Sequence, residues 1–245
     1  MASKTPGSSL RRSAKEIKSF RFLTKVIPVL CILLAIVMTL VYVRSILYSR
    51  YGSFTVSVKK YDALKAGLSL SYTPDFDTGT SVLNAKVATD ITNISGKTLP
   101  KFIDNVDGEH NGDNYAAYTF YCKNAGKDNI DYRYKLYIVN MSYMIERAVR
   151  IRVYVDGKET TYAHTATDGS GPEIDYYDDV AVETTPFRDK STIVQEDITN
   201  FAPEQTTKFT IVIWLEGADP DCVDDIIGGQ IKVAMTMEII SINAE

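Results

Sequence analysis

The sequence predicts an all-β fold, a jelly-roll-like antiparallel β-sandwich, preceded by a single N-terminal transmembrane helix. Two observations predict this class. Residues Val26 to Val43 contain no charged side chain, and apolar residues recur at every second position along much of the chain after Gly67. The chain has 245 residues, so roughly 180 residues remain after Gly67 for the sandwich, enough for a core that folds by itself.

The uncharged stretch reads VIPVLCILLAIVMTLVYV. As a helix it would span about 27 Å, close to the bilayer hydrocarbon thickness of about 30 Å. A buried core helix normally keeps a polar stripe, and this stretch has none. Pro28 falls in the first turn, where its missing N–H costs little. We therefore expect a helix over residues 26–47 that crosses the lipid bilayer.

A cleaved signal peptide is the alternative interpretation of this stretch. Signal peptides have an apolar core of about 7–15 residues that ends at a pair of small residues. Here the apolar core is longer, and the residues after it, Arg44 to Tyr51, read RSILYSRY without such a pair. The sequence therefore favours a retained signal anchor.

Charge is distributed unevenly along the chain. Residues 1–43 carry seven Lys and Arg side chains and one Glu, which leaves 20 basic and 30 acidic side chains for the remaining 202 residues. The basic N-terminal excess predicts a cytoplasmic tail over residues 1–25 and an extracellular C-terminal part, the topology of a single-pass type II protein. The acidic remainder argues against nucleic-acid binding, which requires a basic face.

We expect a juxtamembrane linker over residues 48–66 and the sandwich over residues 67–245. The clearest strand runs from Val149 to Val155, followed by an Asp156-Gly157 turn and a returning strand from Lys158 to Tyr162. Further strands are expected at Leu68, Leu70 and Tyr72; Ala85 to Ile91; Tyr118, Phe120 and Cys122; Tyr132, Tyr134, Leu136 and Ile138; Phe209, Ile211, Ile213 and Leu215; and Ile231, Val233, Met235, Met237 and Ile239.

Two short helices are expected in the sandwich. Glu146 to Val149 has room for one turn. The segment from Asp219 to Gly228 has Asp219 at the N-cap, Pro220 at the first helical position and Gly228 as the C-terminal stop.

No motif that carries catalysis is present in the sequence. It contains no His-Glu-x-x-His zinc helix, no Gly-x-Ser-x-Gly elbow and neither a phosphate-binding nor a dinucleotide-binding loop. His110 and His164 lie in loop-like contexts, where solvated side chains are more common than metal ligands. We therefore predict no catalytic or cofactor-binding residues and no enzymatic activity.

Two acidic clusters raise the question of calcium, because exported acidic loops bind this ion through several oxygen atoms. The clusters are Asp168, Glu173, Asp175, Asp178 and Asp179, and Asp219, Asp221, Asp224 and Asp225. Neither has the twelve-residue EF-hand spacing, and helix capping already accounts for the second. No metal ligands are assigned, and calcium binding by the loop from Asp168 to Asp179 is left open.

Cys122 and Cys222 would face an oxidising exterior, so their pairing is also open. Cys122 shares a strand face with Phe120, which favours a buried thiol that fills apolar space.

The candidate residues for contact with another protein are Tyr137, Tyr154, Tyr176 and Tyr177, since tyrosine is enriched at protein interfaces.

Three stretches carry a resemblance to a known group of proteins: Trp214 to Cys222 with Gly228 to Val233, Tyr118 to Gly126, and the hairpin from Val149 to Ala163. Over residues 67–243 the chain resembles exported β-sandwich proteins of Gram-positive Firmicutes related to the TasA and camelysin (CalY) biofilm-fibre group. The resemblance implies a jelly-roll-like domain and, as in some members, polymerisation by strand donation. Camelysin is classed as a metallopeptidase, but this chain has no recognisable zinc motif, and its N-terminus lacks the usual cleaved signal.

Taken together, these features predict a membrane-anchored, non-enzymatic cell-envelope protein whose acidic domain makes protein–protein contacts or associates with itself. The alternative is an extracellular fibre subunit, or the minor component that anchors a fibre, assembling by strand addition. A camelysin-like metallopeptidase is the third hypothesis.

Overall fold

The computed structural model of the protein describes residues 26–43, 54–59, 67–86 and 88–243. The chain divides into two units, Met1–Ser49 and Arg50–Glu245. The predicted tail over residues 1–25 and residues 44–47 of the predicted span lie outside the described residues.

The described part of the first unit is an apolar helix, Val26–Val43. All its side chains are exposed. The hydroxyl of Thr39 donates a hydrogen bond to the carbonyl of Ala35 at 2.8 Å, so this polar group is satisfied within the helix. Among the described residues this helix alone has the length and composition to cross a membrane, and a signal sequence has the same properties.

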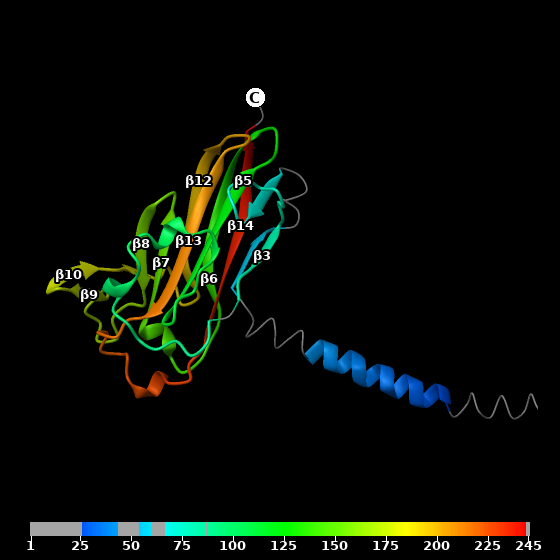
Figure 1. Ribbon diagram of the computed structural model, residues 1–245, viewed down its shortest axis with the longest axis horizontal. Helices are drawn as coiled ribbons and strands as arrows, with labels where there is room; N and C mark the ends of the chain where they lie inside the picture. Colours follow the sequence, from blue (N-terminus) through cyan, green and yellow to red (C-terminus); the bar gives the residue numbers. More distant parts are fainter. Residues whose placement is uncertain (1–25, 44–53, 60–66, 87, 244–245) are drawn as a thin grey trace, which may run out of the picture. The chain divides into compact units, whose positions relative to one another are not determined.

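The second unit is a sandwich of two β-sheets, as the sequence predicted (Figure 1). The five-stranded sheet has the order β12 (Thr192–Phe201), β6 (Asn129–Met141), β14 (Ile231–Asn243), β1 (Thr55–Val58) and β3 (Val82–Asn84). The seven-stranded sheet has the order β11 (Thr185–Pro186), β8 (Lys158–Ala163), β7 (Val149–Val155), β13 (Thr206–Leu215), β5 (Tyr115–Asn124) and β2 (Leu68–Ser71), with β4 (Gly108–Glu109) paired to β5.

A separate two-stranded sheet is formed by β9 (Ile174–Tyr177) and β10 (Val180–Glu183), and it extends from one side of the sandwich in Figure 1. The 3₁₀ helices are η1 (Gly96–Thr98), η2 (Ile103–Asn105), η3 (Ile145–Arg147) and η4 (Asp224–Ile226). Strand pairs are mostly antiparallel, but β1 runs parallel to β14 and β11 runs parallel to β8.

The main core lies between the two larger sheets, and the alternating pattern placed its residues correctly. Along β6, Tyr132, Tyr134, Leu136 and Ile138 are buried while the residues between them are half-buried. The inward-facing rings pack on one another, for instance Phe120 against Phe209 with centroids 5.3 Å apart. Cross-sheet packing of alternate residues is what encloses the core.

The predicted hairpin between β7 and β8 is confirmed. Asp156 and Gly157 both adopt positive φ, +50° and +82°, as a two-residue primed turn requires. The Asp156 carboxylate also accepts a hydrogen bond from the backbone N–H of Lys208 at 2.8 Å, which ties the turn to β13.

A second, smaller core lies on the outer face of the seven-stranded sheet. Its buried residues are Leu99, Ile103, Ala117, Tyr154, Val212 and Trp214. The segment that includes η1 and η2 supplies Leu99 and Ile103, so β13 is covered on both faces. The alternating pattern treated this outer face as solvent-exposed, and that interpretation is wrong for Tyr154 because a loop remote in sequence covers it.

The predicted linker over residues 48–66 requires a correction. Thr55–Val58 is strand β1, and its Val56 and Val58 are buried in the main core. The strand pairs with both β14 and β3, so the sandwich begins before residue 67. A strand of four residues is too short for its alternating pattern to be distinguished from a linker in the sequence.

Other boundaries also differ from those expected. Among the described residues between Ala85 and Ile91 no strand forms, and β3 ends at Asn84. Tyr72 is exposed rather than on the inward face with Leu68 and Leu70. The one-turn helix near Glu146 is present as η3. Strands β9, β10 and β12 were not expected. Charged residues interrupt the apolar residues of β9 and β12, and β10 has only three apolar residues before Glu183.

Candidate functional site

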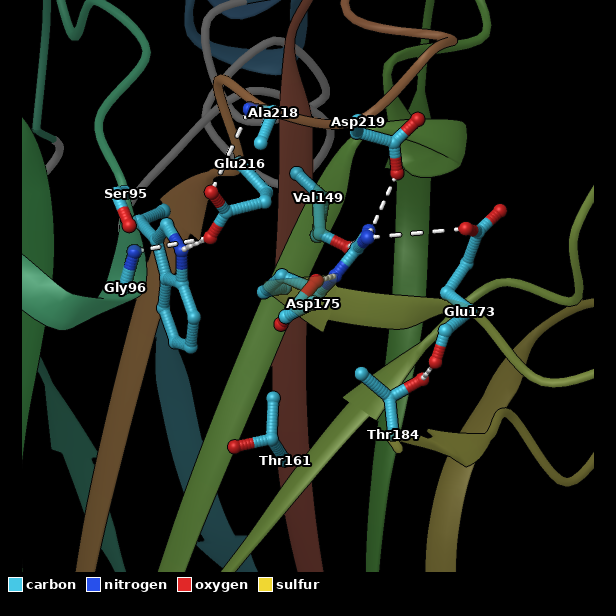
Figure 2. A network of polar contacts seen from close by, with 12 residues as sticks. Ser95, Gly96, Val149, Thr161, Glu173, Asp175, Thr184, Glu216, Ala218 and Asp219 are labelled. Carbon is cyan, nitrogen blue, oxygen red and sulfur yellow. Dashed lines mark hydrogen bonds and ion pairs between the residues drawn. The ribbon is translucent and has the colours of Figure 1, made fainter. Parts of the chain in front are cut away.

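A buried arginine on the outer face of the sandwich organises the candidate site. Arg150 of β7 lies opposite Trp214 of β13, and only 1% of its side chain is exposed. Its Nε donates a hydrogen bond to Asp175 Oδ1 at 2.9 Å, and its Nη2 lies 2.7 Å from Asp219 Oδ2 (Figure 2). Burial by itself lowers the pKa of Arg150, but Asp175 and Asp219 raise it above its usual value, so the guanidinium stays charged.

Two further carboxylates complete the acidic side of this site. Glu173 Oε2 lies 3.9 Å from Arg150 Nη2, and Asp221 accepts a hydrogen bond from the Thr167 hydroxyl at 2.8 Å. Glu173, Asp219 and Asp221 each place one carboxylate oxygen within 4.8 Å of those of the other two. Among the described residues, this is the group of His, Cys, Asp and Glu side chains able to hold a metal ion together.

Burial is the main reason that the pKa of Glu173 is raised above its usual value. The negative charge of Asp219 raises it further, while Arg150 lowers it. The direction shows that the single guanidinium does not neutralise this carboxylate fully.

A neighbouring network holds Glu216, which is buried beside the arginine site. Trp214 Nε1 and the backbone N–H of Gly96 both donate to Glu216 Oε2, at 3.1 and 2.9 Å (Figure 2). The guanidinium of Arg152 lies over the Trp214 ring, 5.2 Å from its centroid. Gly96 fits here because a Cβ would lie 2.4 Å from the Tyr177 hydroxyl and 2.8 Å from Trp214. These contacts attach η1 to the sheet next to the hairpin.

The hairpin formed by β9 and β10 contacts the charged residues around Arg150 through β9. Asp175 is directed inward to Arg150, and the Tyr177 hydroxyl donates to Asp175 Oδ2 at 3.2 Å. The turn residues Asp178 and Asp179 have φ of +51° and +64°, and Asp178 forms an ion pair with Lys97. The hairpin is therefore held to the sandwich by charged and polar contacts at its base and turn.

Apolar side chains of the hairpin remain in solvent. The exposed fractions of Ile174, Tyr176, Val180 and Val182 are 46%, 60%, 62% and 38%. All four residues of β10 are exposed, and β10 pairs with β9 alone among the described strands. The segment from Ile174 to Glu183 contains acidic side chains and no basic one. The register of the hairpin places Ile174 and Tyr176 on one face and Val180 and Val182 on the other. We call the exposed apolar residues of both faces, with the acidic residues around them, the hairpin surface.

The structure divides each acidic cluster of the sequence and joins the two. Glu173 and Asp175 of the first cluster meet Asp219 and Asp221 of the second around Arg150. The remaining members serve elsewhere: Asp168 caps a turn at Ser170, Asp178 pairs with Lys97, Asp179 lies in the hairpin turn, and Asp224 and Asp225 are exposed in η4.

The predicted helix from Asp219 to Gly228 is wrong over most of its length. A single 3₁₀ turn, η4, forms at Asp224–Ile226, with Val223 rather than Asp219 at its N-cap. Asp219 instead faces Arg150 with a fully buried carboxylate. A charge partner distant in sequence therefore outweighs the local preference for helix capping. Gly228 does follow the turn with φ of +79°.

Sequence reasoning missed Arg150 and Glu216 as members of the site. The alternation of β7 correctly directed Arg150 away from the main core, and an outward arginine is normally solvated. Its burial depends on Asp175 and Asp219, which approach from other parts of the chain. No local signal could have revealed it.

The two histidines lie apart from the acidic site. His110 and His164 are both half-buried, and each Nδ1 contacts a nearby backbone carbonyl, at 3.0 Å from Gly108 and 2.6 Å from Thr165. Within the described part of the chain, neither belongs to a group that gathers three metal-ligating side chains.

Both cysteines of the sandwich are free. Cys122 is fully buried, as its shared face with Phe120 predicted, and burial raises the pKa of its thiol. Cys222 is half-buried, and Asn93 Nδ2 donates to its sulfur at 3.4 Å. The open question of their pairing is answered: they do not form a disulfide in this structure.

Of the four candidate contact tyrosines, Tyr176 is the exposed one. Tyr137 and Tyr177 are half-buried, and Tyr154 is buried against Val212 and Trp214, so it cannot serve as a contact residue. Of the four tyrosines, Tyr176 in β9 therefore remains the best candidate for a contact residue.

No family model matches the chain, and no curated protein matches it. Among solved structures, one match is a β-glucosidase from Kluyveromyces marxianus in complex with glucose, with 10% identity over 77% of this chain and 18% of that chain, at a TM-score of 0.23. The selenomethionine-labelled β-glucosidase gives 11% identity, 76% and 18% coverage and the same TM-score. The chain thus spans less than a fifth of these enzymes. The resemblance to the TasA and camelysin group stays a prediction.

Proposed function

We propose that this chain is a membrane-anchored, non-enzymatic cell-surface protein that contacts another protein through the hairpin surface. The observation that carries the proposal is the exposure of Ile174, Tyr176, Val180 and Val182 on one hairpin. Exposed apolar side chains gathered on one element mark an interaction site more often than scattered ones do.

The anchor is supported by the apolar helix Val26–Val43 and by the charge asymmetry around it. Seven basic side chains precede or enter the span, and basic residues are retained on the cytoplasmic side. The acidic sandwich then lies outside the cell. N-terminal sequencing of the protein isolated from membranes should yield an intact N-terminus, whereas a mature chain beginning near Tyr51 would contradict the anchor.

The partner is a protein whose apolar recess is bordered by lysine or arginine. Asp178 is already paired with Lys97, but Asp179 and Glu183 also lie around the apolar residues of the hairpin surface. Complementary charge for these two carboxylates would come from the partner. Aromatic side chains such as Tyr176 commonly supply the anchor of such contacts.

Photocrosslinking in cells tests this directly. A photoreactive phenylalanine analogue at Tyr176 of the full chain should give one discrete crosslinked species, which Ile174→Thr weakens, because Ile174 lies on the same face of β9 as Tyr176. The matched control places the same analogue at Phe102, which is 71% exposed but lies outside the hairpin. Equal crosslinking from both positions, or none from Tyr176, would contradict the proposal.

A fibre subunit, or its anchoring minor component, is the second candidate. The observation that favours it is strand β10, which pairs with β9 alone among the described strands and exposes every residue. An unpaired edge of this kind accepts a further strand. This candidate predicts concentration-dependent polymers that Ala181→Pro abolishes, because the register set by the hydrogen bond from Thr184 to Glu173 directs the N–H of Ala181 away from β9. Sedimentation of the full chain in detergent as one species over a wide concentration range would count against it.

A further inference from the structure

The oxygen atoms of Glu173, Asp219 and Asp221 are spaced as ligands of one cation. Calcium binds oxygen at about 2.3–2.6 Å, so two oxygens on one ion lie at most about 5 Å apart. One oxygen from each of the three carboxylates falls within 4.8 Å of the others. We propose that these three residues form a calcium site at the base of the hairpin formed by β9 and β10.

One buried oxygen atom at this place, Asp219 Oδ2, accepts no hydrogen bond from the described residues. The Asp219 side chain is fully buried, and its Oδ1 accepts from the backbone N–H of Asp221 at 2.7 Å. Its Oδ2 lies 2.7 Å from Arg150 Nη2, but no N–H is directed at it in hydrogen-bond geometry. Arg150 supplies opposite charge to this oxygen, but a carboxylate oxygen has more than one lone pair, so coordination capacity remains for a second cation.

Glu173 is the second carboxylate of the proposed site. The residue is 91% buried, its nearest cationic group is Arg150 Nη2 at 3.9 Å, and the hydrogen bonds of the described residues include none to its carboxylate. A distance of 3.9 Å is beyond hydrogen-bond reach. The carboxylate therefore lies beside Asp219 without a donor of its own.

The charges at the site do not balance. Arg150 supplies one positive charge and directs its Nε to Asp175 and its Nη2 to Asp219. Glu173 and Asp221 then remain without a cationic group in hydrogen-bond contact among the described residues. A divalent cation held by Glu173, Asp219 and Asp221 would offset most of this excess of negative charge.

The donor set favours calcium over other divalent cations. All three ligands are carboxylates, whereas zinc prefers nitrogen and sulfur. They come from two irregular segments rather than a rigid frame, and calcium tolerates irregular coordination completed by water, while magnesium requires a near-ideal octahedron. The bound ion would tie the start of β9 to the loop after β13, and so fix the hairpin surface.

Titration of the full chain in detergent micelles with CaCl₂ tests the site. Calorimetry should give one equivalent of calcium with a Kd of about 0.1–1 mM, typical of extracellular calcium modules, and weaker binding of MgCl₂. Excitation of Trp214, the single tryptophan, should sensitise the luminescence of Tb³⁺ added in place of calcium. Hydrogen exchange in β9 and β10 should slow when calcium is added. No heat up to about 10 mM calcium, far above that Kd range, would overturn the proposal.

Matched variants locate the ion. Glu173→Gln and Asp221→Asn should each weaken calcium binding at least tenfold, while Asp224→Asn and Asp225→Asn, exposed in the same loop, should leave it within twofold. Asp219→Asn also disturbs Arg150 and is not needed. Wild-type affinity in both Glu173→Gln and Asp221→Asn would refute the site. This outcome is independent of the partner proposed for the hairpin surface, because binding is measured on the chain by itself.

Discussion

The Nε of Arg150 donates a hydrogen bond to Asp175 Oδ1 at 2.9 Å, with both side chains 1% exposed. Through this contact, β7, near the middle of the seven-stranded sheet, holds the base of the hairpin formed by β9 and β10. A charged pair removed from water makes the position of the hairpin depend on a single guanidinium.

Removal of that guanidinium should be severely destabilising. Arg150→Met keeps much of the side-chain volume but leaves Asp175 and Asp219 buried without a counter-charge, and we expect a loss of about 3–5 kcal/mol in the free energy of unfolding. Urea denaturation of the full chain in micelles measures the loss. Glu173→Gln added to Arg150→Met should recover part of it, since one uncompensated carboxylate is removed; an unchanged midpoint in Arg150→Met would contradict the central role of this residue.

Gly96 should not tolerate a side chain. In Gly96→Ala the added Cβ would lie 2.4 Å from the Tyr177 hydroxyl and 2.8 Å from Trp214, so we expect a loss of about 1–3 kcal/mol from overpacking. Trp214 fluorescence reports the local change during denaturation. Gly217→Ala is the matched control, because its Cβ would meet Asn93 no closer than 3.4 Å; equal losses in the two variants would rule out the close packing at Gly96.

The raised pKa of Glu173 predicts the sign of a pH effect in calcium-free buffer. An acid whose pKa is higher in the folded than in the unfolded protein binds more protons when folded. Its ionisation therefore lowers stability as pH rises from the ordinary glutamate value through the raised one. Glu173→Gln should lose less stability over this range than the wild type. If the stabilities of the two proteins change with pH in parallel, the ionisation of Glu173 does not affect stability.

Saturating calcium should make wild-type protein melt at a higher temperature than Glu173→Gln. With saturating calcium the wild type gains binding energy that Glu173→Gln cannot, so its melting temperature should rise above that of the variant. Thermal melts with and without CaCl₂ measure the crossing. Equal shifts of both proteins by calcium would contradict a role for Glu173 in binding.

Asp189 should act in the opposite direction. Its carboxylate accepts hydrogen bonds from the backbone N–H groups of Ser191 and Thr192, at 2.9 and 2.8 Å, which hold its pKa well below the usual value. This stabilisation is present above the ordinary aspartate pKa and is lost as pH falls through the lowered one. Acid denaturation of Asp189→Ala should accordingly be shallower than that of the wild type; identical acid limbs would exclude this contribution.

Elements with a local signal could be predicted from the sequence. The apolar helix Val26–Val43 needs only an uncharged run, and β6, β7 and β14 show alternation long enough to be recognised. The turn at Asp156 and Gly157 depends on two residues that accept positive φ. In each case the information lies within a single stretch of about 18 residues or fewer.

The candidate site had no such signal, although several of its residues were noted. Both acidic clusters were recognised, but as separate groups, and Asp219 was assigned to a helix cap. Their meeting around Arg150 depends on which face of β7 is covered and by what. Likewise, β1 could not be predicted from its own residues, because it is a strand through its pairing with β14, whose partner residues lie almost 180 positions later.

The sequence by itself therefore determined that this protein has an apolar helix and a β-sandwich, because both follow from periodicity over short stretches. Tertiary structure alone decided which charges are buried, which tyrosine is exposed and where three carboxylates converge. Those properties depend on contacts between segments that are distant along the chain, and the free energy of a buried charge is set by every group around it rather than by its neighbours in sequence.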